Sequence, residues 1–130
     1  MANKGSIGLK IEGFKELYKN MGLLEEEILK SAVKGLKITA QNILGESQKL
    51  VPVDTGTLQK SGAIKVDSQN LMAQISYNTP YALKQHEDAT LNHPNGGEAK
   101  YLERPFNEKS GELEVNVGNE IQRILRKKSV

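Results

Sequence analysis

The strongest constraint on the fold is a series of apolar residues at helical spacing between Leu23 and about Leu50. They recur at intervals of three, four or seven residues, which places them on one face of an α-helix: Leu24, Ile28, Ala32, Leu36, Ala40, Ile43 and Leu50. Three glutamates occupy the expected first turn, where the helix dipole favours negative charge, and Pro52 follows the last apolar position. The pattern predicts a long amphipathic helix that needs a second layer to cover its apolar face.

Strand patterns supply that second layer. Apolar residues alternate with small or polar ones over residues 7–11, which predicts a short strand or extended arm near the N-terminus. Ala63–Val66 and Leu71–Tyr77 have strand character and are joined by four polar residues, which is typical of an antiparallel hairpin. We therefore expect a small, mostly antiparallel sheet.

The second half of the chain is expected to be mainly helix and loop. Thr79 and Pro80 fit the N-cap and first position of a short helix that covers residues 82–87. Residues 88–100 are rich in Asn, Pro and Gly, which predicts an exposed loop. Tyr101–Leu102 is expected to add one short strand. Pro105 then fits the first turn of a C-terminal helix of about six turns, whose apolar stripe is Leu113, Val117, Ile121 and Ile124.

These elements predict one α+β domain over residues 1–130, with residues 1–20 as an N-terminal arm, since 130 residues suffice for a single core. In this arrangement the long N-terminal helix packs on the small, mostly antiparallel sheet. A short helix follows the hairpin, and the C-terminal helix ends the chain.

Composition excludes several classes of protein. The chain has no cysteine, which rules out disulfide scaffolds, zinc ribbons and thiol nucleophiles. No apolar run approaches the ~18 residues of a membrane span, so no membrane partner is expected. The formal net charge is only +2, which argues against a nucleic-acid-binding protein that relies on its overall charge.

One cluster has the chemistry of metal ligands: His86, Glu87, Asp88 and His93. Two of its members lie in or beside the predicted loop, which provides no fixed coordination geometry, so surface polarity is the preferred interpretation. The sequence also lacks a nucleophile elbow and a phosphate-binding loop. We therefore expect no catalytic residue, cofactor or metal, and a small hydrolase or metal enzyme is the least favoured alternative.

Four short segments in a fixed order carry a family resemblance. They are Val51–Leu58 (VPVDTGTL), Ser61-Gly62, Thr79–Ala82 (TPYA) and Tyr101–Phe106 (YLERPF). Their order and spacing resemble the tail-completion and minor capsid proteins of long-tailed bacteriophages, a family of head–tail joining and morphogenesis proteins. The resemblance runs from about residue 20 to the C-terminus. The segment after Tyr81-Ala82 departs from the family, because relatives commonly continue there with Glu and Gly-Thr.

The resemblance implies a structural virion protein without catalytic activity. It implies a ring, expected to be a hexamer, at the neck between head and tail, with head-completion or connector proteins on one side and tail-terminator or tail-tube proteins on the other. Phage DNA would pass close to such a ring. A head-decorating minor capsid protein and a tail terminator remain alternatives, as does a nucleic-acid-binding protein that uses the basic end of the C-terminal helix.

The motif residues have structural roles that fit this interpretation. Asp54 and Thr55 can bond nearby backbone amides, Gly56 allows a sharp turn, and Leu58 is expected to anchor that turn in the core. For Tyr81, packing in the core is preferred over a place at a subunit boundary. The full set of motif residues is Pro52, Asp54, Thr55, Gly56, Leu58, Ser61, Gly62, Pro80, Tyr81, Ala82, Arg104, Pro105 and Phe106.

Candidate subunit contacts come from three places: the N-terminal arm, the predicted loop and the charged helix ends. The basic helix end suits the helix dipole and solubility, and contact with phosphate or an acidic surface is the second interpretation. Pairing between acidic and basic helix ends of neighbouring copies is a further hypothesis. The candidates are Ile7, Leu9, Ile11, Glu25, Glu26, Glu27, His93, Asn95, Arg126, Lys127 and Lys128.

Overall fold

The computed structural model describes residues 5–20, 26–52, 56–88 and 97–128. Within these residues the chain forms three strands, β1 (Ile7–Ile11), β2 (Gly62–Asp67) and β3 (Met72–Tyr77). Its helices are α1 (Phe14–Asn20), α2 (Glu26–Leu50), α3 (Thr57–Lys60), α4 (Ala82–Glu87), α5 (Glu103–Lys109) and α6 (Glu112–Lys128). The predicted α+β class is confirmed.

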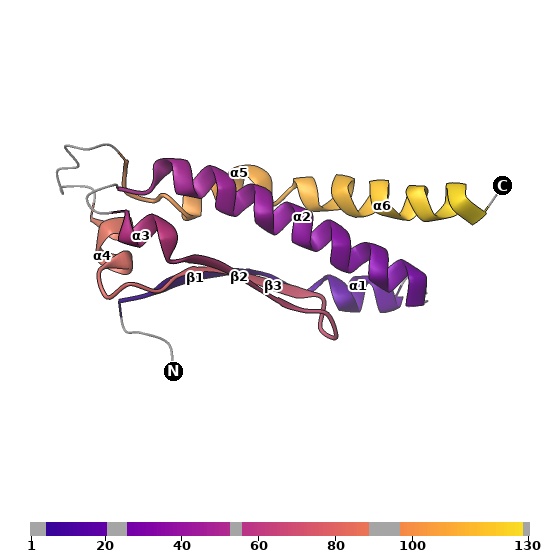
Figure 1. Ribbon diagram of the computed structural model, residues 1–130. Helices are drawn as coiled ribbons and strands as arrows, with labels where there is room; N and C mark the ends of the chain where they lie inside the picture. The colour runs from indigo at the N-terminus through magenta and orange to yellow at the C-terminus, as the bar shows by residue number, and fades with distance from the viewer. Residues whose placement is uncertain (1–4, 21–25, 53–55, 89–96, 129–130) are drawn as a thin grey trace.

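The three strands form one antiparallel sheet with the order β1-β3-β2. The register places Leu9 opposite Ile75, and Ile75 opposite Ile64, so apolar side chains line one face of the sheet. Because side chains alternate between the faces of a strand, the other face carries residues such as Lys10, Gln74 and Lys65. The long helix α2 lies across the apolar face, as Figure 1 shows.

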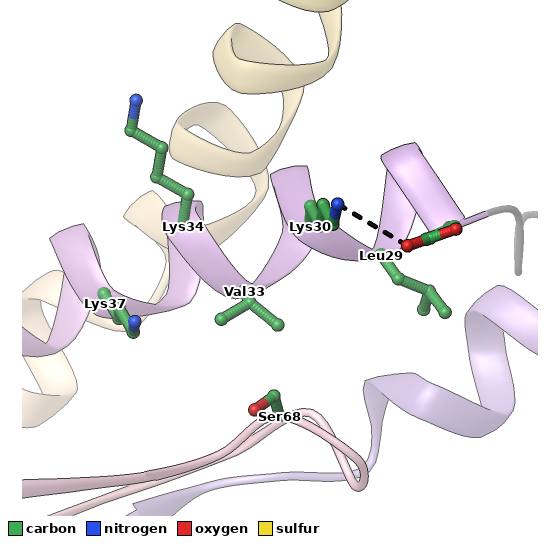
Figure 2. A pocket seen from close by; sticks show the side chains of 7 residues that line it. Leu29, Lys30, Val33, Lys34, Lys37 and Ser68 are labelled. Atoms are coloured by element: carbon green, nitrogen blue, oxygen red, sulfur yellow. Dashed lines mark ion pairs between the residues drawn. The ribbon is translucent and has the colours of Figure 1, made fainter.

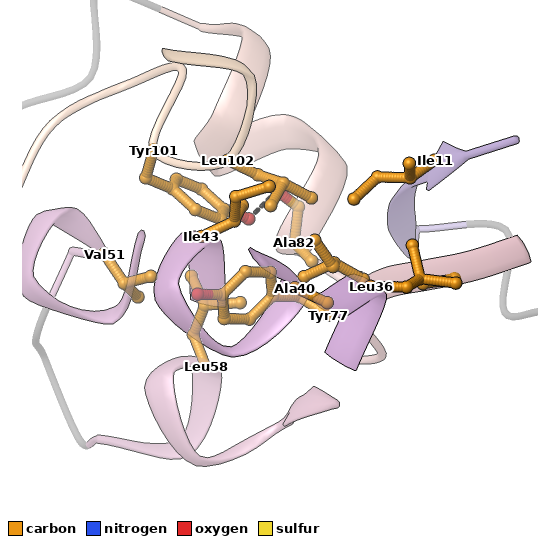
Figure 3. Packing of buried hydrophobic residues seen from close by; sticks show 12 residues of the cluster. Ile11, Leu36, Ala40, Ile43, Val51, Leu58, Tyr77, Ala82, Tyr101 and Leu102 are labelled. Carbon is orange, nitrogen blue, oxygen red and sulfur yellow. Dashed lines mark hydrogen bonds between the residues drawn. The ribbon is translucent and has the colours of Figure 1, made fainter. Parts of the chain in front are cut away.

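The core lies between α2 and the sheet (Figure 3). Two tyrosines occupy its centre, Tyr77 from β3 and Tyr101, with ring centroids 5.1 Å apart in an edge-to-face arrangement. Each of the two tyrosine hydroxyls has a hydrogen-bond partner. Tyr77 Oη lies 2.7 Å from Ser47 Oγ, and Tyr101 Oη donates to the carbonyl of Ala82 at 2.6 Å. A buried hydroxyl without a partner is costly, so these bonds allow polar rings in a thin core.

The helix α6 packs against α2 at close range. A Cβ atom added to Gly35 in α2 would lie 2.7 Å from backbone and side-chain atoms of Val117 in α6. Beside this contact, Asn116 Nδ2 donates to Thr39 Oγ1 at 2.9 Å, and Thr39 Oγ1 donates to the Gly35 carbonyl at 2.9 Å. The small residue and the short polar network together bring the two helix backbones close.

Three sequence predictions about local structure are wrong. Tyr101–Leu102 forms a turn that leads into α5, and both side chains are buried in the core. The predicted C-terminal helix is two helices, α5 and α6, separated at Ser110-Gly111. Both helices contact α2.

The third correction concerns the start of α4. This helix begins at Ala82, with Tyr81 as its N-cap residue, instead of at Pro80 with Thr79 as the cap. Thr79 is buried, and its carbonyl accepts the amide of Ala82 at 3.2 Å in a turn. The Thr79 side chain therefore does not cap the helix, while the predicted body of the helix, residues 82–87, is confirmed.

Candidate functional site

The first motif segment forms the connection from α2 to the sheet. Asp54 and Thr55 lie outside the described residues. Gly56 has a φ of +78°, a left-handed conformation that glycine adopts without strain, and Leu58 is buried in the core. Ser61 Oγ donates to the Leu58 carbonyl at 2.8 Å. The turn therefore has a sharp bend at one end and an apolar anchor at the other.

The chain before and through the last motif segment, residues 97–106, is attached to the end of α2. Glu98 donates its amide to the Leu50 carbonyl at 2.8 Å, and a Cβ atom on Gly97 would lie only 2.4 Å from Pro52 Cα. Arg104 forms an ion pair with Glu98 at 2.6 Å. Pro105 is buried, and Phe106 packs against the core. The segments of the motif, distant in sequence, thus meet around the C-terminal end of α2.

His86 is buried, so the expectation that it contributes surface polarity is wrong. Its Nε2 accepts the amide of Glu103 at 3.0 Å, its Nδ1 lies 2.9 Å from Glu87 Oε1, and its ring packs edge-on against Tyr101. Burial lowers the pKa of His86, which favours the neutral ring. Both ring nitrogens are therefore engaged: Nε2 joins α4 to α5, and Nδ1 contacts a carboxylate of α4 itself.

Metal binding has no geometric support at this place. Glu87 also contacts Lys100, and this pairing lowers the pKa of its carboxyl group. Across the part of the chain that the structure describes, no group of three His, Asp or Glu side chains is arranged to hold a metal ion. His93 lies outside that part.

Tyr81 is exposed, which contradicts the expected place in the core. The side chain of Ala82 points into the core, so its neighbours on this short helix turn outward, and the core positions for aromatic rings are taken by Tyr77 and Tyr101. Tyr81 is 39% exposed and Leu83 is 40% exposed. Both residues lie at the α4 end of the molecule, which is opposite the C-terminal end of α6 (Figure 1), and together they are called the α4 patch below.

A groove lies between the N-terminal half of α2 and the β2–β3 turn (Figure 2). Leu29 and Val33 point from α2 toward Ser68 in the turn and make its apolar wall. Charged side chains of α2 surround this wall, and the groove has a volume of about 500 Å³. Its charged lining residues are Glu26, Lys30, Lys34 and Lys37.

The predicted contact residues fall into different environments. Ile11 is buried, and Ile7 and Leu9 pack against the core, so the side chains of this strand serve the monomer. Arg126 and Lys127 are exposed on the last turns of α6. Glu26 is exposed at the start of α2. The remaining candidates have no described side chain: Glu25, Glu27, His93, Asn95 and Lys128.

The fold can now be compared with known proteins. Residues 15–122 match the family model HK97-gp10-like, described as "Bacteriophage HK97-gp10, putative tail-component". The chain belongs to this family. The match covers most of the chain, including all four motif segments and the groove residues. No curated protein and no solved structure matches the chain significantly.

Membership of the HK97-gp10-like family agrees with the resemblance seen in the motif segments and assigns the chain to a family of phage tail components. Among the described residues, no helix has an apolar stretch that could cross a bilayer. The motif residues themselves build the fold around the end of α2. The α2 groove is not visible in the sequence, because it forms only when α2 and the β2–β3 turn pack together. The exposure of Tyr81 agrees with the less favoured of the two places weighed for it, a subunit boundary.

Proposed function

We propose that this HK97-gp10-like protein is a non-enzymatic structural virion protein that forms a ring at the head–tail junction of a tailed phage. Its neighbours in the virion would be head-completion or connector proteins on one side and tail-terminator or tail-tube proteins on the other. The family match supports the coarser part of this proposal, a tail component. The surfaces of the molecule support the ring, and the position at the neck is what the resemblance of the motif segments implies.

The observation that carries the proposal is that unlike surfaces occupy different ends of one elongated chain (Figure 1). The α4 end presents Tyr81 and Leu83, while the α6 end presents Leu125, which is 58% exposed, beside basic side chains. A two-fold dimer buries the same patch on both partners, whereas two different patches make head-to-tail contacts that close into a ring when the rotation permits. A hexamer fits this arrangement.

The sheet offers a second head-to-tail element. Within the described residues, β1 and β2 are the outer strands, and each pairs only with β3. An unpaired strand edge is a template for pairing with another chain. We propose that the N-terminal strand contributes to subunit contact through this backbone edge, since its apolar side chains are already packed in the core.

Nucleic-acid binding through the end of α6 is the weaker candidate. Arg126 and Lys127 are exposed there, but the chain as a whole has a net charge of only +2. Proximity to DNA in the channel of a ring requires no affinity. A steep fall in DNA affinity with rising salt would be the signature of the alternative.

The number of copies in purified virions tests the proposal against its structural rivals. A neck ring predicts a handful of copies per particle, whereas a head-decorating protein predicts hundreds. Replacing Tyr81 and Leu83 with Asp should prevent assembly of the purified chain while leaving the monomer folded. Lys84→Asp, on the same short helix and also exposed, is the matched control and should assemble normally. If the Tyr81 and Leu83 variant assembles as well as the Lys84→Asp control, the α4 patch is not a subunit contact.

A further inference from the structure

We propose that the α2 groove receives the first turn of α6 from a neighbouring copy, Glu112–Val115. This inference rests on the proposed ring and names one of its contacts. The contact joins two surfaces that have no part in the motif. One is the α2 groove with its lysines, and the other is the acidic first turn of α6 with the exposed Val115.

The groove has an apolar wall and surplus positive charge. Three lysines surround Leu29 and Val33, and their local pairing is incomplete. Lys30 lies 3.5 Å from Glu26, but both side chains are largely exposed, and exposed pairs of this kind contribute little. Lys37 has no ion-pair partner among the residues that the structure describes. The groove therefore suits an apolar side chain flanked by carboxylates.

The start of α6 has this chemistry. Val115 is 62% exposed, and Glu112 and Glu114 lie within one turn of it. Glu112 lies 3.6 Å from Lys109 in a partly exposed pair, which contributes little. Val117 faces α2, and a residue two positions away on a helix points in nearly the opposite direction. Val115 therefore points outward, away from its own α2. Glu114 is exposed and has no ion-pair partner within the described part of the chain.

Other occupants fit the groove less well. The C-terminal turns of α6 carry Leu125, but Arg123 and Arg126 lie beside it and would meet lysines of the same sign. A phosphate backbone would satisfy the lysines but leave the wall formed by Leu29 and Val33 without an apolar partner. The groove and the acidic turn are different surfaces of one chain, so their contact is head-to-tail, as a ring requires.

Charge reversal in two complementary variants tests this contact. The groove variant carries Lys30→Glu and Lys37→Glu, and the turn variant carries Glu112→Lys and Glu114→Lys. Lys34 is left unchanged because it pairs with Glu120 of α6 at 3.4 Å and supports the fold. In each variant alone, both sides of the contact have the same sign, so we expect loss of the oligomer in native mass spectrometry and sedimentation.

An equimolar mixture of the two variants should assemble again. Each groove would then meet a turn of opposite charge, and the subunits would alternate around a ring with an even number of members. Recovery in the mixture also shows that neither variant is misfolded. Lys19→Glu with Lys60→Glu changes the net charge by the same amount as the groove variant, at exposed positions outside the groove and outside the sheet, and should assemble like the unmodified chain.

Several results would overturn the contact. The contact is refuted if either charge-reversal variant alone assembles like the unmodified chain, or if the mixture of the two does not assemble. It is also refuted if the control variant loses the oligomer to the same extent, or if the unmodified chain stays monomeric. If the variants still form rings and functional tails, the proposed ring stands and uses other contacts. If the unmodified chain neither assembles nor occurs at the neck of virions, the proposed function fails as well.

Discussion

Replacing Gly35 with alanine should destabilise the protein, although Gly→Ala within a helix ordinarily has the opposite effect. The added Cβ atom would lie 2.7 Å from three atoms of Val117, two of which belong to the backbone of α6. Backbone atoms cannot change rotamer to relieve the contact as a flexible side chain can, so α6 must move away from α2. Overpacking of this kind costs about 1–3 kcal/mol.

A gain in helix stability of up to about 1 kcal/mol offsets part of that cost, since glycine is a poor helix former. We therefore expect a net loss of about 1–2 kcal/mol in the free energy of unfolding. Gly45→Ala is the matched control in the same helix, because no atom lies within 4 Å of its added Cβ. This variant should gain about 0.5–1 kcal/mol.

Urea unfolding followed by circular dichroism measures both variants, at a concentration at which the chain is monomeric, because assembly adds stability of its own. With a typical m-value of about 1–2 kcal/mol/M, the two midpoints should differ by about 1 M or more, with opposite signs relative to the unmodified protein. If Gly35→Ala were as stable as Gly45→Ala, the close packing of α2 and α6 would be refuted.

Three further predictions concern the core and the histidine. Tyr101→Phe leaves the buried Ala82 carbonyl without its 2.6 Å hydrogen bond and should lower the free energy of unfolding by about 1 kcal/mol in urea denaturation; an unchanged midpoint would contradict this. Leu58→Ala removes a buried side chain from the core and should lower the free energy of unfolding by about 2–5 kcal/mol. Leu125→Ala, at an exposed position, should change the free energy of unfolding of the monomer little. Burial lowers the pKa of His86 below its usual 6.5, so more protons bind the unfolded than the folded chain, and stability should fall as the pH drops below about 6.5. His86→Gln should flatten this pH dependence in a series of denaturation curves, and an equally steep fall in the variant would assign the effect to other groups.

Much of the fold was predictable because local and tertiary preferences agree. The apolar stripe of α2 continues over seven turns with Ala32, Leu36 and Ile43 all buried, so its helical period is unambiguous. The hairpin was predicted at 63–66 and 71–77 and is found at Gly62–Asp67 and Met72–Tyr77. In both cases the same residues that favour the local conformation also fill the core.

The sequence predictions are wrong where local patterns allow more than one structure and tertiary packing decides between them. Tyr81 and Tyr101 have the same chemistry, and only the arrangement of α4 and α5 around the core decides which ring is buried. The break between α5 and α6 interrupts an apolar stripe that continues on both sides of Ser110-Gly111. The Ser-Gly pair is a local turn signal, but the helical spacing of the apolar residues after it favours one continuous helix.

The candidate surfaces were hidden for a related reason. Leu29, Val33 and Ser68 form one groove although 35 positions or more separate Ser68 from the two α2 residues, and no short motif links them. The sequence motif marked the residues that build the connection at the end of α2. Apart from Tyr81, which belongs to the motif, the exposed residues that could hold subunits together lie outside it, on α4, α6 and the first half of α2.

Electron microscopy of particles made when this gene is disrupted in its phage or prophage tests the central claim most directly. A ring subunit at the head–tail junction predicts DNA-filled heads beside free tails, with joining restored when the unmodified gene is supplied from a plasmid. Intact tailed particles in the disrupted strain would contradict a joining role and indicate a dispensable component of the virion.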